Sequence, residues 1–302
     1  MRAEDRSSRY LFGIGCCCLA TLGWSLSGLF VRWVPALDGW AVNGYRAPAT
    51  SICLLVYLAL RYRGDLIRHL WPRQPQALLV VGLFFSVGST LYVYALTMGT
   101  VASVSVLGAT SPFFAALLAW LIMRERTSAV SLVATIIALI GVAVVVQAEM
   151  SALATGIYAA MISLGYAFCF AGQTVTLRQY RDLEMIPGIA LGGLMVFAFV
   201  AVFIGLPHLP LWQMGLLALM GLVQLAIPLI LFAVGAKHVP VVPAILISVA
   251  DVVLNPFWVW LVHGEEPPSG TVAGGALILS AIIGATLYEN RRQRIVAARQ
   301  EV

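Results

Sequence analysis

Residues 111–125 read SPFFAALLAWLIMRE, and residues 251–265 read DVVLNPFWVWLVHGE. When the two segments are aligned on their final glutamates, their Trp-Leu pairs coincide and Ser111 lies opposite Asp251. The segments start 140 residues apart, and the pairs Gly23-Trp24 and Gly165-Tyr166 recur at nearly the same spacing. The chain is therefore expected to contain two copies of one unit, residues 1–150 and residues 151–302.

Each segment lies within an apolar stretch, and ten such stretches fill most of the 302 residues. Apolar residues make up 61% of the chain and charged residues only 10%, whereas a soluble domain needs about a quarter of its residues charged. The stretches are continuous rather than alternating, which predicts membrane-spanning helices and not barrel strands. The expected spans are residues 11–34, 40–60, 76–97, 101–123, 128–147, 152–176, 186–204, 212–234, 240–262 and 271–287.

The basic residues predict the orientation of the chain. Of the 18 Lys and Arg residues, 17 are arginines and the other is Lys237. With a cytoplasmic N-terminus, 16 of them fall on the inside, only Arg32 falls outside, and Arg46 lies within the second span. Because cytoplasmic loops carry an excess of Lys and Arg, both termini are predicted to be cytoplasmic. The net charge of +5 reflects this asymmetry, and no nucleic-acid partner is expected.

Two copies with five spans each make the second copy enter the membrane from the opposite side. The predicted fold is thus an all-α polytopic membrane protein with ten transmembrane helices in a 5+5 inverted repeat. Such repeats are typical of secondary transporters, which bind substrate near the midplane between the halves and alternate access by rocking one half against the other.

The sequence resembles the EamA-type domain of the drug/metabolite transporter superfamily. The resemblance is carried by Trp24-Ser25-Leu26-Ser27-Gly28, by Arg46 early in the second span, and by the two segments quoted first. It implies ten spans, with spans one, three, four, six, eight and nine around a central cavity, and a bacterial inner-membrane exporter of amino acids or other metabolites. Position 251 is aspartate where the family more often has glutamate. Because the aspartate side chain is shorter, its carboxylate does not extend as far from the helix as the family's glutamate would.

Only Asp251 and Arg46 clearly place a charge inside the hydrocarbon, at a cost of roughly 3 kcal/mol each on insertion scales. Asp251 lies at the middle of the ninth span, where it could titrate during transport or hold a cationic group of the substrate. Burial favours the neutral, protonated form of a carboxylic acid. The hypothesis is therefore that Asp251 couples transport to protons. The alternative is a permanent Asp251–Arg46 ion pair that locks the second and ninth spans together. Both residues are candidate coupling residues, although a structural role is favoured for Arg46 because the second span is peripheral in the family.

Polar and aromatic side chains on the same spans complete the expected cavity. Ser248, Asn255 and Trp258 lie on the same helical stripe as Asp251. A stripe that faced only lipid would have no need for these hydrogen-bonding and aromatic side chains. Because a glutamine side chain inside the membrane needs a polar partner, Gln224 is expected to contact either a neighbouring helix or the substrate. The candidate cavity residues are Trp24, Tyr92, Ser111, Tyr166, Gln173, Gln224, Asp251, Asn255 and Trp258.

Two glycine pairs with four-residue spacing, Gly188/Gly192 and Gly270/Gly274, suit close helix–helix contact. Packing within the chain is the preferred interpretation, with dimerisation as the alternative.

The sequence lacks a phosphate-binding loop and any His/Glu pair at metal-ligand spacing inside a span, so no enzyme activity, metal or cofactor is expected. The predicted function is a secondary active transporter that exports a small amino-acid-like or aromatic metabolite from the cytoplasm, with protons as a possible second partner. The alternatives are an efflux carrier for cationic drugs and a passive facilitator or channel.

Overall fold

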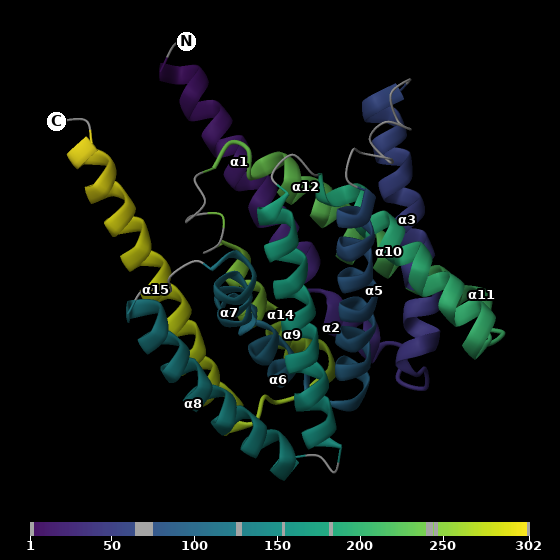
Figure 1. The fold of residues 1–302 in the computed structure, drawn as a ribbon. Coiled ribbons are helices and arrows are strands. Elements are labelled where there is room, and N and C mark those ends of the chain that lie inside the picture. The colour runs from purple at the N-terminus through teal and green to yellow at the C-terminus, as the bar shows by residue number, and fades with distance from the viewer. Residues whose placement is uncertain are drawn as a thin grey trace.

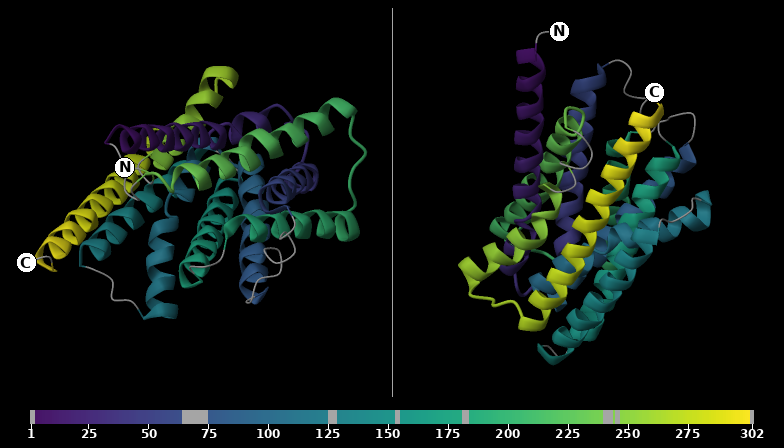
Figure 2. Two further views of the ribbon diagram at one scale, coloured as in Figure 1. Left: turned by 90° about the horizontal axis from the view of Figure 1, so that it is seen from above. Right: turned by 90° about the vertical axis from the view of Figure 1, so that its left-hand side faces the viewer.

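The computed structural model describes residues 3–63, 75–124, 129–152, 155–180, 184–239, 244 and 247–300, and within these ranges every regular element is a helix. The helices run side by side as a bundle (Figures 1 and 2). The elements are α1 (Ala3–Trp24), α2 (Ser27–Arg32), α3 (Gly39–Tyr62), α5 (Pro75–Met98), α6 (Val101–Gly108), α7 (Ser111–Met123), α8 (Ala129–Ala152), α9 (Gly156–Gln179), α10 (Met185–Phe199), η2 (Val200–Ile204), α11 (Leu211–Leu219), η3 (Met220–Ala226), α12 (Ile227–Gly235), α14 (Asp251–His263) and α15 (Ser269–Gln300).

Eight helical stretches in the described part of the chain are long and apolar enough to cross a membrane, and they correspond to expected spans one, three to eight and ten. The second expected span forms α3, a 24-residue helix whose buried face carries Asn43, Arg46, Thr50 and Ser51. The ninth forms a shorter apolar helix, Ile247–His263, and its expected start at residues 240–243 lies outside the described residues. The chain is thus an all-helical, multi-pass membrane protein.

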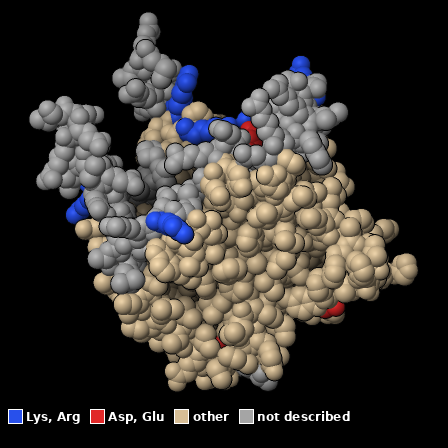
Figure 3. Space-filling model, in the orientation of Figure 1, with Lys and Arg blue, Asp and Glu red and all other residues tan. Residues whose placement is uncertain are grey.

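The two ends of the bundle differ in charge. Helix α1 begins and α15 ends at the same end of the bundle (Figure 1). On the face shown in Figure 3, the Lys and Arg side chains of the described residues gather at that end. Many large apolar side chains of the described residues are also exposed, among them Leu139 at 61% and Val202 at 74%. This distribution agrees with the asymmetry expected from the sequence, because lipid-facing surface is apolar and basic residues collect at one membrane face.

Three expected spans contain a turn near their middles that interrupts the regular α-helix, although the backbone at Leu26, Thr110 and Ala250 stays in the right-handed helical region. The first span breaks between α1 and α2 at Ser25 and Leu26, and the fourth breaks between α6 and α7 at Ala109 and Thr110. The ninth has a turn at Ala250, directly before α14. The second and third breaks immediately precede Ser111 and Asp251, which the sequence repeat aligns, and α7 and α14 both contain 13 residues.

Side-chain hydroxyls and a proline account for two of the breaks. Ser25 Oγ donates to the Leu22 carbonyl at 2.8 Å, and Thr110 Oγ1 donates to the Leu107 carbonyl at 2.6 Å. Hydroxyls that bond to the backbone one turn back compete with continuation of the helix. Pro112 lies in the first turn of α7, where its missing N–H costs nothing.

The eighth span is continuous but contains the π-helical segment η3 between α11 and α12. Thr50 Oγ1 of α3 donates to the Gly221 carbonyl within η3 at 3.0 Å, so a neighbouring helix satisfies a backbone group in this irregular region. π-Helical turns inside α-helices occur frequently at functional sites. Gln224 lies in this segment, buried at 4% exposure.

The two glycine pairs lie at contacts within the chain, as preferred from the sequence. Helix α8 packs along α15 and α5 packs along α10. A Cβ atom on Gly274 would lie 2.6 Å from the Gly141 carbonyl oxygen, and one on Gly192 would lie 2.5 Å from that of Gly82. At these positions the helix backbones touch, so any side chain would separate them.

We therefore expect the substitution Gly274→Leu to destabilise the protein by about 1–3 kcal/mol, the usual cost of overpacking. The measurement is thermal unfolding in detergent, followed by tryptophan fluorescence. The matched control is Gly284→Leu on the same helix, because no atom lies within 4 Å of the Cβ position at Gly284. Equal midpoint shifts for the two variants would contradict this account of the contact.

Candidate functional site

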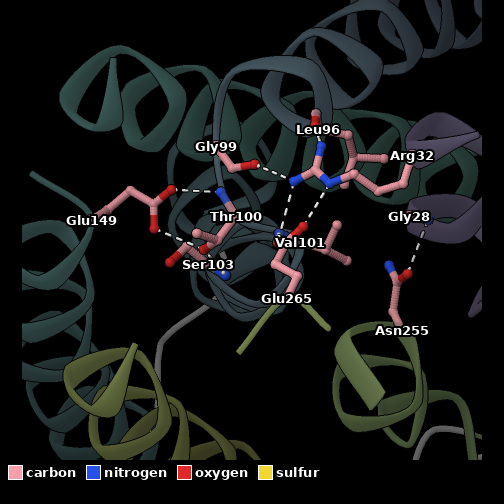
Figure 4. Close-up of polar contacts among 10 residues, drawn as sticks. All are labelled: Gly28, Arg32, Leu96, Gly99, Thr100, Val101, Ser103, Glu149, Asn255 and Glu265. Carbon is pink, nitrogen blue, oxygen red and sulfur yellow. Dashed lines mark hydrogen bonds and ion pairs between the residues drawn. The ribbon is translucent and has the colours of Figure 1, made fainter. Parts of the chain in front are cut away.

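The side-chain amide of Asn255 joins the three broken spans to α5. Its Nδ2 lies 3.0 Å from both Ser27 Oγ of α2 and Ser105 Oγ of α6, and 3.3 Å from the Tyr92 hydroxyl of α5. Its Oδ1 accepts from the backbone N–H of Gly28 at 3.0 Å (Figure 4). Asn255 is fully buried. Because buried polar groups are costly unless bonded, this amide holds four chain segments in one arrangement.

Glycine at position 28 permits this contact. A Cβ atom there would lie 2.8 Å from Asn255 Oδ1 and 2.5 Å from Val101 Cγ1. The Ser27 hydroxyl also hydrogen-bonds to the Tyr92 hydroxyl. The quoted Trp-Ser-Leu-Ser-Gly motif thus supplies the turn, as well as the Ser27 hydroxyl and the Gly28 backbone N–H that Asn255 binds.

Two tryptophans lie beside the break in the first span. Trp258 Nε1 donates to Ser25 Oγ at 3.0 Å and so ties α14 to the turn between α1 and α2. The ring of Trp24 packs against Phe232 of α12, with centroids 5.2 Å apart. The structure therefore brings Trp258 into the polar network, whereas Trp24 packs between helices of the first and eighth spans.

Tyr92 and Tyr166 form an aromatic pair in the same region, with ring centroids 4.8 Å apart and planes at 46°. Gly108, at the end of α6, leaves room for the Tyr166 ring, since a Cβ there would lie 2.9 Å from it. The Tyr92 hydroxyl bonds Asn255, which lies one helical turn after Asp251. Ser89, the hydrogen-bond partner of Arg46, lies one turn before Tyr92 on α5. The tyrosine pair therefore lies close to the helical turns that carry both intramembrane charges.

Asp251 and Arg46 do not form the ion pair that the sequence left open. Among the residues that the structure describes, the buried Asp251 Oδ1 has no hydrogen-bond partner. Arg46 donates from Nη2 to Ser89 Oγ at 3.3 Å, but its buried Nε and Nη1 have no partner in the same part of the chain. Both residues are described, and the ion pairs between described residues do not join them. Within these ranges, each charge is thus left without an opposite charge at contact distance.

The remaining candidates from the sequence lie around this region without joining the hydrogen-bond network. Ser111 is the first residue of α7, directly after the break, and is half-buried. Gln173 is buried in α9. Gln224 has a buried Oε1 with no hydrogen-bond partner among the described residues. The unsatisfied side-chain atoms of Arg46, Gln224 and Asp251 therefore come from α3, η3 and α14.

A second polar network, which sequence reasoning missed, surrounds the turn between α5 and α6 (Figure 4). Glu149 of α8 is fully buried and accepts from the Thr100 backbone N–H at 2.6 Å and from the Thr100 hydroxyl at 2.8 Å. Glu265 accepts from the backbone N–H of Val101 at 2.9 Å. The first N–H groups of a helix lack partners within it and favour negative charge, so both carboxylates stabilise the start of α6.

Arg32 completes this network from the other side. Its Nε donates to Glu265 at 2.6 Å, and its two Nη atoms donate to the carbonyls of Leu96 and Gly99 at the end of α5. A signal for this role was present in the sequence, because Arg32 is the one arginine on the expected outer side. An arginine that runs against the charge asymmetry needs a local partner, and here Glu265 provides it.

Apolar helices that break near their middles around buried polar groups are typical of membrane transport proteins. The model of the EamA-like transporter family matches residues 11–147 and again residues 153–287, and the chain belongs to this family.

Other comparisons agree with this class of protein. The chain is 28% identical over 236 residues to the pseudopaline exporter CntI of two Pseudomonas aeruginosa strains, covering 76% of this chain and 80% of the exporter. A solved crystal structure has the same fold, with a TM-score of 0.64 and 19% identity, over 94% of this chain and 98% of that one.

Replacing Asn255 by alanine should lower the free energy of unfolding by about 1–3 kcal/mol, because it leaves the Gly28 N–H buried without its acceptor. Thermal unfolding in detergent measures the change. Ser248→Ala is the matched control from the same span, because the Ser248 hydroxyl bonds only the Ala244 carbonyl one turn back. Equal losses of stability in the two variants would contradict this role of the Asn255–Gly28 hydrogen bond.

A double-mutant cycle on Arg32→Gln and Glu265→Gln should give a coupling energy of about 1.5–3 kcal/mol, as for hydrogen bonds to charged groups. The reference cycle uses Arg61→Gln and Glu184→Gln, whose ion pair is longer, at 3.3 Å, and more exposed. That pair should couple by about 1 kcal/mol or less. A larger coupling in the Arg61 cycle would contradict the view that the shorter, half-buried contact of Arg32 with Glu265 makes the stronger pair.

Proposed function

We propose that this protein is a secondary active transporter that exports a small, polar, amino-acid-like metabolite from the cytoplasm. The observation that carries the proposal is the unpaired Asp251 at the start of α14, directly after one of three breaks near the middles of spans. A continuous, fully paired helix bundle would have no use for such a charge in the membrane.

The broken helices supply the means of movement. A helix that is interrupted in the membrane can reorient its two halves separately, and transporters place substrate sites at such interruptions. The breaks before Ser111 and Asp251 occupy matching positions of the sequence repeat. The two family matches support residues 1–150 and 151–302 as two repeats. In this proposal the repeats are related by inversion and carry ten spans in total. In this proposal both termini face the cytoplasm of a bacterium.

Proton coupling follows from the state of Asp251. A carboxylate with a buried, unsatisfied oxygen can gain or lose a proton without breaking an internal ion pair. In one half of the cycle it faces the cytoplasm and in the other the outside. Exchange of a proton for substrate at this residue would then drive export by the proton gradient.

Export as the direction is supported by the name of the pseudopaline exporter, to which 76% of the chain is similar. The aromatic pair Tyr92–Tyr166 also suits a cationic drug, the second candidate substrate. The buried positive charge of Arg46 weighs against a substrate that carries only positive charge.

Inside-out membrane vesicles with an acidic interior should take up a radiolabelled amino-acid mixture faster when they contain this protein. Asp251→Asn should abolish the gradient-stimulated part of the flux, because an amide cannot carry the proton. Asp38→Asn is the matched control, since Asp38 only caps α3 at the Ala41 N–H and asparagine caps equally well.

Gradient-dependent uptake that is undiminished in Asp251→Asn would refute the coupling role. Uptake without saturation or counterflow would identify a passive facilitator. If ethidium is taken up and amino acids are not, the protein is an efflux carrier for cations.

A further inference from the structure

We propose that Arg46 is the anion-binding residue of the transport site and that the substrate carries a carboxylate as well as a cationic group. This inference rests on the proposed transport function and adds the substrate class and a specificity-determining residue. It reverses the structural role that the sequence favoured for Arg46.

The first argument is the state of the guanidinium. Arg46 is 2% exposed, and its Nε and Nη1 together carry three N–H donors, all without a partner among the described residues. An arginine that only fixed the packing of α3 would be expected to have its donors satisfied by neighbouring carbonyls or carboxylates. Arg32 shows that pattern, with Glu265 and two carbonyls around it.

The second argument is the surroundings of Arg46 on the protein side. Its one hydrogen bond goes to Ser89, which in turn donates to Asn43 Oδ1 at 3.2 Å. These contacts orient the guanidinium without neutralising it. Within the described residues the ion pairs do not include Arg46. A buried cation without an anion is strongly unfavourable, so the site favours a ligand that provides one.

The third argument is the pairing of two opposite, separate charges. Arg46 bonds Ser89 of α5, and one turn further along α5 Tyr92 bonds Asn255, which lies one turn after Asp251. The two charges thus approach the same part of α5, yet they do not form an ion pair with each other. A zwitterion between them would offer its carboxylate to Arg46 and its ammonium to Asp251. Both buried charges would then be compensated in the loaded state, whereas a simple amine or cationic drug would leave Arg46 without an anion.

A carboxylate suits this donor set. Its two oxygens accept from adjacent N–H groups of one guanidinium, and such charge-assisted pairs are about twice as strong as neutral hydrogen bonds. An amide of the same molecule keeps the ammonium and the side chain but loses the negative charge. Acid and amide therefore form a matched pair of probes for Arg46 alone.

The experiment measures thermal stabilisation of the purified full-length protein by free amino acids and by their α-carboxamides. Ligand binding raises apparent stability by mass action. For the wild-type protein, at least one free acid should stabilise, with an apparent affinity at least about tenfold higher than that of its amide. Arg46→Gln should bring this ratio close to one, and Arg46→Lys should keep part of it because lysine retains the charge.

Arg61→Gln is the matched control, because Arg61 lies on the same helix and pairs with Glu184 at 3.3 Å near the end of α3. It should leave the acid-to-amide ratio unchanged. If Arg46→Gln does not yield folded protein, Arg46→Lys and the wild-type ratio decide the question.

The proposal is overturned if amides stabilise the wild-type protein as well as acids do, if no free acid stabilises it, or if the ratio is undiminished in Arg46→Gln or, where that variant does not fold, in Arg46→Lys. Failure of the transport function itself gives a different result, since gradient-driven uptake would then be absent from wild-type vesicles. Normal uptake of free acids by wild-type vesicles together with an undiminished ratio in Arg46→Gln would reject the role of Arg46 alone.

Discussion

The arrangement of the broken spans depends on one side chain, the buried amide of Asn255. Three hydroxyls and one backbone N–H from α2, α5 and α6 converge on it. Broken helices expose backbone groups that lipid cannot satisfy, so a protein that interrupts its spans must supply polar partners from elsewhere in the chain. Asn255 does this for α2 and at the same time fixes α14, which begins with Asp251.

The two polar networks of this protein have different characters. Around the turn between α5 and α6, the carboxylates of Glu149 and Glu265 meet helix N–H groups and Arg32, so charge is compensated. In the region of Asp251 and Arg46, charge is left uncompensated. Saturated contacts stabilise one arrangement of helices, whereas unsatisfied ones favour a further partner. This contrast separates a structural network from a candidate binding region within one bundle.

Family membership and the geometry of the helices both indicate the same class of protein, a membrane transporter. The family match and the similarity to a named exporter define a membrane transporter. The irregular points of the helices, at Ser25, Thr110, Ala250 and η3, then indicate where within the bundle transport would be carried out. The proposed specificity arises from side chains that a family-level match does not distinguish.

Hydropathy and charge distribution alone determined that the chain is a multi-pass helical membrane protein, because these are local properties of contiguous residues. The repeat also aligned Ser111 with Asp251, and helices α7 and α14 begin at those residues. Periodicity placed Asn255 and Trp258 on the stripe of Asp251, and both lie in the polar network. The sequence could not give the partners of Asn255, which lie up to 228 residues away. Nor could it show that Asp251 and Arg46 stay apart or that Glu149 and Glu265 cap α6, since only helix packing decides which distant side chains meet.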